Sequence, residues 1–116
     1  MSKERHNVSY WADRAEKATG FLTKTDRQIA ELKVKYERDK RKAKKVWSAT
    51  FLRVDGKNAE ERKCKAEIHE DFQLAQEAEM TSLLEYEFLS NERESADRVI
   101  RFWQSWQKAY GQGTVL

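Results

Sequence analysis

The sequence predicts an all-α protein: a long antiparallel helical hairpin of coiled-coil type, with a shorter or continuous N-terminal helix, that oligomerises. Proline is absent and there are only 4 glycines in 116 residues. The chain therefore lacks the turn residues that a sheet protein needs at each hairpin. Apolar residues also recur with an alternating spacing of three and four residues, which is typical of paired helices and not of strands.

The first half of the chain keeps this spacing over twelve positions, of which nine are apolar. The positions are Trp11, Ala15, Ala18, Leu22, Thr25, Ile29, Leu32, Tyr36, Asp39, Ala43, Val46 and Thr50. Thr25-Asp-Arg-Gln28 has the form of a capping box and follows Gly20 closely. This arrangement favours a break, with one helix at about 8–20 and the next at about 26–54.

Asp55-Gly56-Lys57-Asn58 predicts the turn of the hairpin at 55–58. Glycine and asparagine tolerate left-handed backbone, and Asn58 is a suitable N-cap for the helix that follows.

The second half predicts a helix at about 59–110 by the same spacing, with nine of thirteen positions apolar. The positions are Ile68, Phe72, Ala75, Glu79, Ser82, Tyr86, Leu89, Arg93, Ala96, Ile100, Trp103, Gln107 and Tyr110. Asn91-Glu-Arg-Glu94 has the form of a second capping box, which allows a kink near residue 90. We expect residues 111–116 to form a flexible tail and the whole chain, 1–116, to be a single domain.

Charge is divided into two blocks of opposite sign. Residues 27–65 hold 14 Lys and Arg against 6 Asp and Glu, whereas residues 66–94 hold 1 against 9. A hairpin folded about Gly56 would set these blocks against each other, with Lys42 and Lys45 near the acids at 67–70. Charge pairing of this kind fixes the register beside a coiled-coil seam, so it needs no ligand. The same register would carry Trp11 toward Trp103 and Trp106.

The sequence argues against an enzyme, a metal site and a membrane protein. It has no phosphate-binding loop, no nucleophile elbow and no His pair with metal-ligand spacing. Cys64 and His69 do not share a helix face well. We therefore expect no catalytic residues, no cofactor and no metal. No stretch approaches the roughly 20 apolar residues that span a bilayer, and the polar start and the single cysteine predict a cytoplasmic protein.

Cations and aromatic residues gather around the predicted turn, in the pattern of a protein that binds single-stranded nucleic acid. The candidate residues are Lys44, Lys45, Arg53, Lys57, Arg62, Lys63, Lys65, Trp47 and Phe51. Cations can follow the phosphate backbone while aromatic rings stack on bases. In the alternative interpretation, the two aromatic residues pack inside the hairpin and the lysines are only solvated.

The segment 96–110 is apolar on more than one face, which one hairpin seam cannot bury. Self-association through this segment would cover the remainder, so we expect a homo-oligomer. The candidate interface residues are Val99, Phe102, Trp103, Trp106 and Tyr110.

The order of these features resembles phage-encoded recombination mediator proteins, the class represented by the mediator of T4-type phages. The stretches that carry the resemblance are Ile29-Ala-Glu-Leu-Lys-Val-Lys, Lys44-Lys-Val-Trp-Ser-Ala-Thr-Phe-Leu-Arg53, Asn58-Ala-Glu-Glu-Arg-Lys-Cys-Lys-Ala-Glu67 and Glu92-Arg-Glu-Ser-Ala-Asp-Arg-Val-Ile-Arg-Phe-Trp-Gln-Ser-Trp106. The resemblance covers about residues 8–110. It implies binding of single-stranded DNA, with Lys44, Lys45 and Arg53 at the DNA-contacting positions, and assembly through C-terminal helices into rings. The turn and the C-terminal segment are shorter here than in that class.

We therefore expect a non-enzymatic, single-stranded-DNA-binding accessory protein of phage DNA recombination, working in the cytosol of the infected bacterial host. The resemblance also implies a recombinase or a single-strand binding protein as partner. The alternative is a small phage-type helical protein-binding module or inhibitor, such as an anti-defence protein, that does not bind nucleic acid. A scaffolding coiled coil is a third interpretation.

Overall fold

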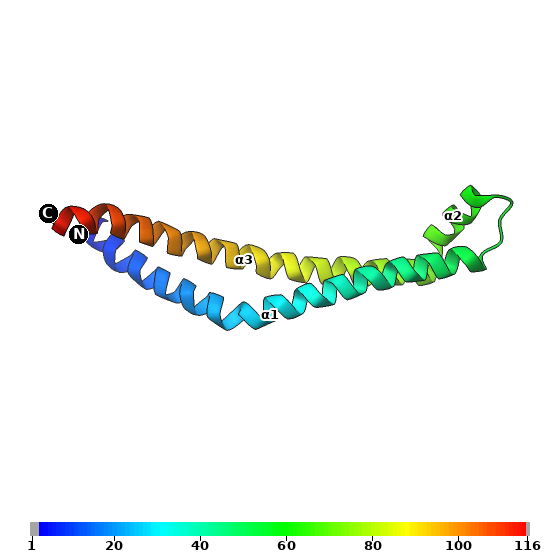
Figure 1. Ribbon diagram of the computed structural model, residues 1–116, viewed down its shortest axis with the longest axis horizontal. Helices are drawn as coiled ribbons and strands as arrows, with labels where there is room; N and C mark the ends of the chain where they lie inside the picture. The colour runs from blue at the N-terminus through cyan, green and yellow to red at the C-terminus, as the bar shows by residue number, and fades with distance from the viewer. Residues whose placement is uncertain (1–2, 116) are drawn as a thin grey trace. The chain divides into compact units, whose positions relative to one another are not determined.

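The computed structural model describes the backbone of residues 3–115 and the side chains of residues 8–110. Within this range the chain forms three helices and no strand, α1 (Lys3–Arg53), α2 (Ala59–Ile68) and α3 (Glu70–Val115). Figure 1 shows α1 and α3 running antiparallel, with α2 between them in the sequence at the turn. The predicted all-α fold with a long helical hairpin is confirmed.

Of the two forms expected for the N-terminal helix, the structure shows the continuous one: α1 is a single helix through 20–25, and separate helices at about 8–20 and 26–54 are not formed. Thr25 does not act as an N-cap. Its hydroxyl donates a hydrogen bond of 2.7 Å to the carbonyl of Phe21 inside the helix. Gly20 keeps a negative φ, as do the other glycines described. The capping-box sequence at 25–28 therefore does not end the helix, because the three-and-four apolar spacing continues through it.

The turn contains the predicted N-cap but not the predicted left-handed backbone. The Asn58 side chain accepts a 2.9 Å hydrogen bond from the backbone N–H of Glu61 and so caps α2. No residue described in the turn has a positive φ. Gly56 is needed for space instead: a Cβ there would lie 2.6 Å from Cγ and 3.1 Å from the backbone nitrogen of Arg62.

A break at His69, which the sequence pattern did not predict, divides the expected helix 59–110 into α2 and α3. His69 has extended backbone (φ −66°, ψ 140°). Its imidazole Nδ1 accepts a 3.1 Å hydrogen bond from the backbone N–H of Asp71, so His69 caps α3. The Gln73 side chain donates 2.7 Å to the carbonyl of Glu67 at the end of α2. From Glu70 the helix continues to Val115, so the backbone of the expected tail is helical from residue 111 to residue 115.

The chain divides into two compact units. The terminal unit comprises 1–28 and 89–116, and the turn unit comprises 29–88. Each contains one part of α1 beside one part of α3.

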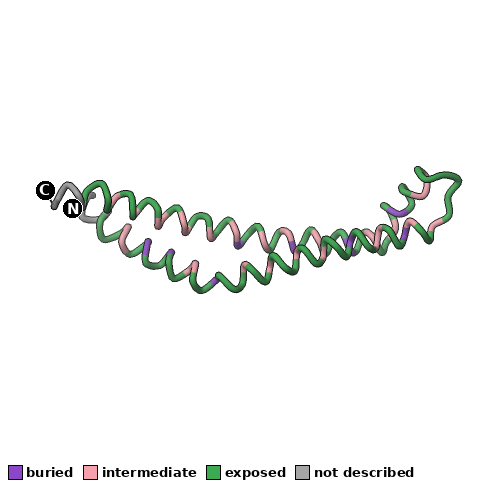
Figure 2. Tube along the Cα trace, viewed as in Figure 1, coloured by how far each residue is buried: buried purple, intermediate pink, exposed green. Residues whose placement is uncertain are grey.

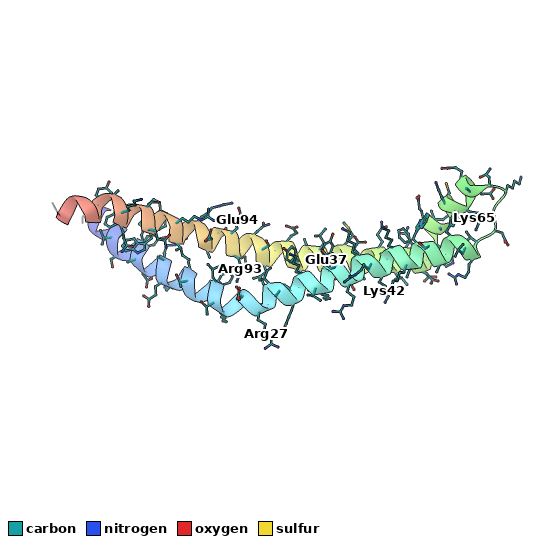
Figure 3. All side chains as sticks on the ribbon, in the orientation of Figure 1. Arg27, Glu37, Lys42, Lys65, Arg93 and Glu94 are labelled. Atoms are coloured by element: carbon teal, nitrogen blue, oxygen red, sulfur yellow. The ribbon has the colours of Figure 1, made fainter. Side chains whose placement is uncertain are left out.

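In the terminal unit, the pairing of α1 with α3 includes one charged side chain. Arg93 is 20% exposed. It donates to the carbonyl of Leu22 at 2.8 Å and to the Thr25 hydroxyl at 2.7 Å, and Figure 3 labels it on α3. Nearer the chain ends, the ring of Trp11 lies 4.7 Å from the ring of Phe102. Trp11 therefore contacts the residue next to the expected Trp103.

In the turn unit, the helices meet along small and aromatic side chains. Ala43 and Thr50 of α1 and Ala75 and Ser82 of α3 are buried, and Figure 2 shows the buried positions within long exposed stretches. Tyr36 stacks on Tyr86 with 6.5 Å between ring centroids. The seam is narrow, so most of the surface of each helix remains in water.

The register of the turn unit differs from the expected one. A turn centred on Gly56 would place Asp39 opposite Gln73, but Asp39 accepts a hydrogen bond from the Ser82 hydroxyl. Arg53 pairs with Asp71 at 2.9 Å. The offset arises because residues 59–68 form α2, and pairing with α3 starts only after His69. The expected placement of Lys42 and Lys45 against the acids at 67–70 is therefore wrong.

Candidate nucleic-acid interface

Four cations lie on the side of α1 that faces away from α3. Tyr36, Asp39, Ala43 and Val46 form the seam with α3 and are buried or half-buried. Because a helix turns by about 100° per residue, positions between these seam residues project outward. The outward cations, all exposed, are Arg38, Arg41, Lys44 and Lys45, and we call them the outer basic face.

One exposed acid, Glu37, borders the outer basic face four residues before Arg41, and it forms no ion pair with the face among the described residues. Between residues 38 and 48 the only acid is Asp39. Its carboxylate turns into the seam, where it accepts a hydrogen bond from Ser82. None of the four cations of the face has an ion pair among the described residues. Their charge is therefore available to an external anion.

The expected pairing of the two charge blocks is largely absent. In the part of the chain that the structure describes, the run 33–45 makes one ion pair with α3, between Lys35 and Glu85 at 3.6 Å. Lys40 lies over the ring of Tyr36 on its own helix, 5.9 Å from the centroid. Lys42, labelled in Figure 3, borders a groove whose other wall includes Ala75 and Ala78. The acids and the bases thus face mostly different directions.

Arg38 and Arg41 were missing from the candidates that the sequence suggested. The seam positions Tyr36, Asp39 and Ala43 contained the necessary signal. A helical wheel drawn on that seam places both arginines opposite it. The expected register sets the whole basic run against the acidic block, so it does not predict that these two arginines face solvent.

At the turn, three of the predicted cations bind groups of the chain itself. Arg53 forms the ion pair with Asp71. Lys65, labelled in Figure 3, donates 2.6 Å to the carbonyl of Asp55 and lies 3.4 Å from a Glu61 carboxylate oxygen. Arg62 is half-buried and donates 3.0 Å to the carbonyl of Phe51. The Arg62 and Lys65 hydrogen bonds hold α2 against the end of α1 and the turn, and the Arg53 ion pair joins α1 to α3.

The two predicted aromatic residues stack on each other. The rings of Trp47 and Phe51 lie 5.4 Å apart at an interplanar angle of 11°, and both residues are half-buried. The guanidinium carbon of Arg62 lies 4.4 Å from the centroid of Phe51. Phe51 is thus held by two side chains of the chain itself, and Trp47, one helical turn from Lys44, is the better-placed ring for a base.

The remaining predicted cations are exposed. Lys57 and Lys63 flank the start of α2 without an ion pair among the described residues. Lys44 and Lys45 belong to the outer basic face. The structure therefore separates the predicted set into cations that brace the turn and cations that remain open to solvent.

The predicted oligomer interface lies in the terminal unit, on α3. Trp106 stacks with Trp103 at 5.3 Å and lies 5.0 Å from the ring of Tyr110. Phe102 is 48% exposed, although its ring touches Trp11. Val99 is half-buried. Part of this apolar surface is therefore covered inside the unit and part remains in water.

Other kinds of site find little support among the described residues. No three His, Cys, Asp or Glu side chains gather there in a way that could hold a metal ion. In the same residues, no helix has a stretch long and apolar enough to cross a membrane.

Comparison of the chain with protein families, with curated proteins and with solved structures gives no match. The function is therefore inferred from the geometry of the chain and from the resemblance in helix and charge order.

Proposed function

We propose that the protein binds single-stranded DNA with little sequence preference, through the outer basic face of α1, as a non-enzymatic accessory protein of DNA recombination. The observation that carries the proposal is the presence of four exposed cations on one side of α1, none of which has an ion pair among the described residues. Two acids are near: Glu37 is exposed at the start of the face, and Asp39 points into the seam. From Arg38 to Lys45 the face extends about 10 Å along the helix axis.

Such a surface would bind the phosphate backbone and read no base edges, because lysine and arginine contacts to phosphates carry no sequence information. Trp47 adds a half-buried ring beside Lys44, on which a base of any kind can stack. Lys57 and Lys63 would extend the contact at the turn.

A role in phage recombination follows from the resemblance to the mediator class, as does a recombinase or a single-strand binding protein as partner. Self-association through Phe102, Trp103 and Trp106 would place several outer basic faces in one particle. Linked sites bind a long strand far more tightly than one site does, because the later contacts are intramolecular.

The direct test is a fluorescence-anisotropy titration of a labelled oligothymidylate with the wild-type protein and with a variant that carries Arg38→Gln, Arg41→Gln, Lys44→Gln and Lys45→Gln. We expect binding by the wild-type protein and at least a tenfold loss in the variant. A matched control replaces four cations elsewhere, Lys17→Gln, Lys24→Gln, Arg98→Gln and Arg101→Gln, and changes the net charge equally. Equal weakening by both variants would mean that total charge matters and the face does not.

Competition with unlabelled strands distinguishes the proposed ligand from other nucleic acids. Mixed-sequence single strands should compete as well as oligothymidylate, and duplex DNA should compete less well. Absence of any binding at low salt would reject the proposal in favour of a protein-binding module.

A further inference from the structure

The side of α3 that faces away from α1 carries large apolar side chains that no described residue covers. They belong to the turn unit and are mostly exposed: Met80 61%, Leu84 64% and Phe88 67%. Leu74, 59% exposed, lies at the edge of this side and also lines the groove between α3 and α1. The seam positions of α3 in the same unit, Ala75 and Ser82, are buried. Two different sides of the same helix are thus apolar, and only one of them has a partner. We call the exposed set the apolar face of α3.

One end of the apolar face is hollowed. A shallow depression there is lined by Leu74 and Met80 together with Glu70, Gln73, Gln76 and Glu77. An apolar floor with polar edges is the form of a site that receives a side chain from another helix. Met80 suits such a site, since its flexible thioether adapts to different shapes.

The charge around the apolar face has one sign. Between Glu70 and Glu92, α3 contains no Lys or Arg. Glu70, Glu77 and Glu87 are exposed beside the apolar side chains. A second copy that presented the same face would bring acid against acid along the whole contact, which is unfavourable. A helix with apolar residues on one side and Lys or Arg around them matches both the apolar and the electrostatic character of the face.

We propose that the apolar face of α3 docks a basic amphipathic helix of a partner protein. From Met80 to Phe88 the face extends about 12 Å, which accommodates roughly two turns of a partner helix. Apolar anchors at helical spacing would fill the spaces around Leu84 and Phe88, and cations would lie against the flanking glutamates. This surface is separate from the outer basic face of α1, and the proposal does not depend on DNA binding.

The test uses an 18-residue synthetic peptide with leucines on one helical side and lysines elsewhere, titrated into the full-length protein by calorimetry at physiological salt. A second peptide, with glutamate at every lysine position, is the charge-reversed probe. We expect the wild-type protein to bind the lysine peptide and not the glutamate peptide. The Leu84→Gln and Phe88→Gln double variant should bind the lysine peptide at least tenfold more weakly.

The matched control is a Val34→Gln and Leu52→Gln double variant, since both residues are exposed apolar side chains of α1. It should bind like the wild-type protein. A Glu77→Lys and Glu87→Lys variant should lose affinity for the lysine peptide and gain affinity for the glutamate peptide, and this reversal does not depend on the apolar substitutions.

Equal binding of the lysine peptide by the wild-type protein and the Leu84→Gln and Phe88→Gln variant would overturn the proposal and indicate adsorption by charge alone. A sedimentation mass that falls on the same substitutions would also overturn it, because the occupant would then be a second copy of the chain. The Arg38, Arg41, Lys44 and Lys45 variant should bind the peptide normally, so failure of DNA binding and failure of docking are told apart.

Discussion

Arg62 of α2 packs its guanidinium on the ring of Phe51, with 4.4 Å from the guanidinium carbon to the ring centroid, and donates a 3.0 Å hydrogen bond to the carbonyl of the same residue. One side chain therefore closes the turn of the hairpin onto the end of α1. A cation that the sequence offered for DNA binding is used to hold two helices together. The binding surface must then be sought among the cations without internal partners.

Replacing Arg62 by alanine should lower the free energy of unfolding by about 1–2 kcal/mol. The loss combines a cation–π contact with a hydrogen bond from a charged donor. Chemical denaturation followed by circular dichroism measures it. Lys63→Ala, one residue away at an exposed position, should change stability by less than about 0.5 kcal/mol. Equal effects of the two substitutions would show that Arg62 does not brace the turn.

Two glycine-to-alanine substitutions should act in opposite directions. Gly56→Ala would place a Cβ 2.6 Å from Arg62 Cγ, and overpacking of this kind costs about 1–3 kcal/mol. Gly20→Ala has nothing within 4 Å of the new Cβ and lies in the interior of α1. It should raise stability by about 0.5–1 kcal/mol, because glycine is a poor helix former. Thermal unfolding of both variants checks the signs, and a destabilising Gly20→Ala would contradict the continuous α1.

Removing Arg93 should cost more than removing an exposed arginine of the same helix. Its side chain is 20% exposed, and its guanidinium donates to the carbonyl of Leu22 and the hydroxyl of Thr25. Arg93→Ala should therefore cost about 1.5–3 kcal/mol. Arg98 is exposed, and among the described residues it pairs with Glu94, four residues earlier. Arg98→Ala should therefore cost about 0.3–0.5 kcal/mol. Similar values for the two variants would place Arg93 outside the seam.

Phe102→Gln combined with Trp106→Gln should give a particle of smaller mass that keeps its helical content. Burying a large apolar side chain contributes roughly 1.5–3 kcal/mol, and both side chains extend from a segment that is apolar on several sides. Light scattering after size exclusion measures the mass. Leu52→Gln, at an exposed position of α1, should leave the mass unchanged. Unfolding of the double variant would assign both residues to the core of the monomer, and an unchanged mass would place the interface elsewhere.

The seam and the fold class could be predicted from the sequence because they depend on spacing alone. Tyr36, Ala43 and Ala75 lie where the three-and-four pattern places them. The N-cap at Asn58 followed from its side chain. The break at His69 could not be predicted, because it depends on an imidazole that caps α3 and on Gln73 reaching back to α2.

Because the break at His69 was not predicted, the expected register of α1 against α3 was wrong. The expected pairing of the basic run with the acids was wrong for the same reason. Because α2 is a separate helix, Asp39 meets Ser82, and Arg38, Arg41, Lys44 and Lys45 have no ion pair among the described residues. Arg38 and Arg41 then become part of the candidate site. Arg53 remains in an ion pair with Asp71. The candidate site on α1 therefore could not be predicted without the correct register of α1 against α3.

The salt dependence of oligonucleotide binding tests the central claim most directly. The logarithm of the binding constant should fall linearly with the logarithm of salt concentration, by roughly 0.7 for each phosphate contact on a single strand. If Arg38, Arg41, Lys44 and Lys45 each contact a phosphate, replacing all four by glutamine should reduce the slope by up to about 2.8. Replacing Lys17, Lys24, Arg98 and Arg101 should leave the slope as in the wild-type protein. An unchanged slope in the first variant would contradict the assignment of DNA binding to the outer basic face.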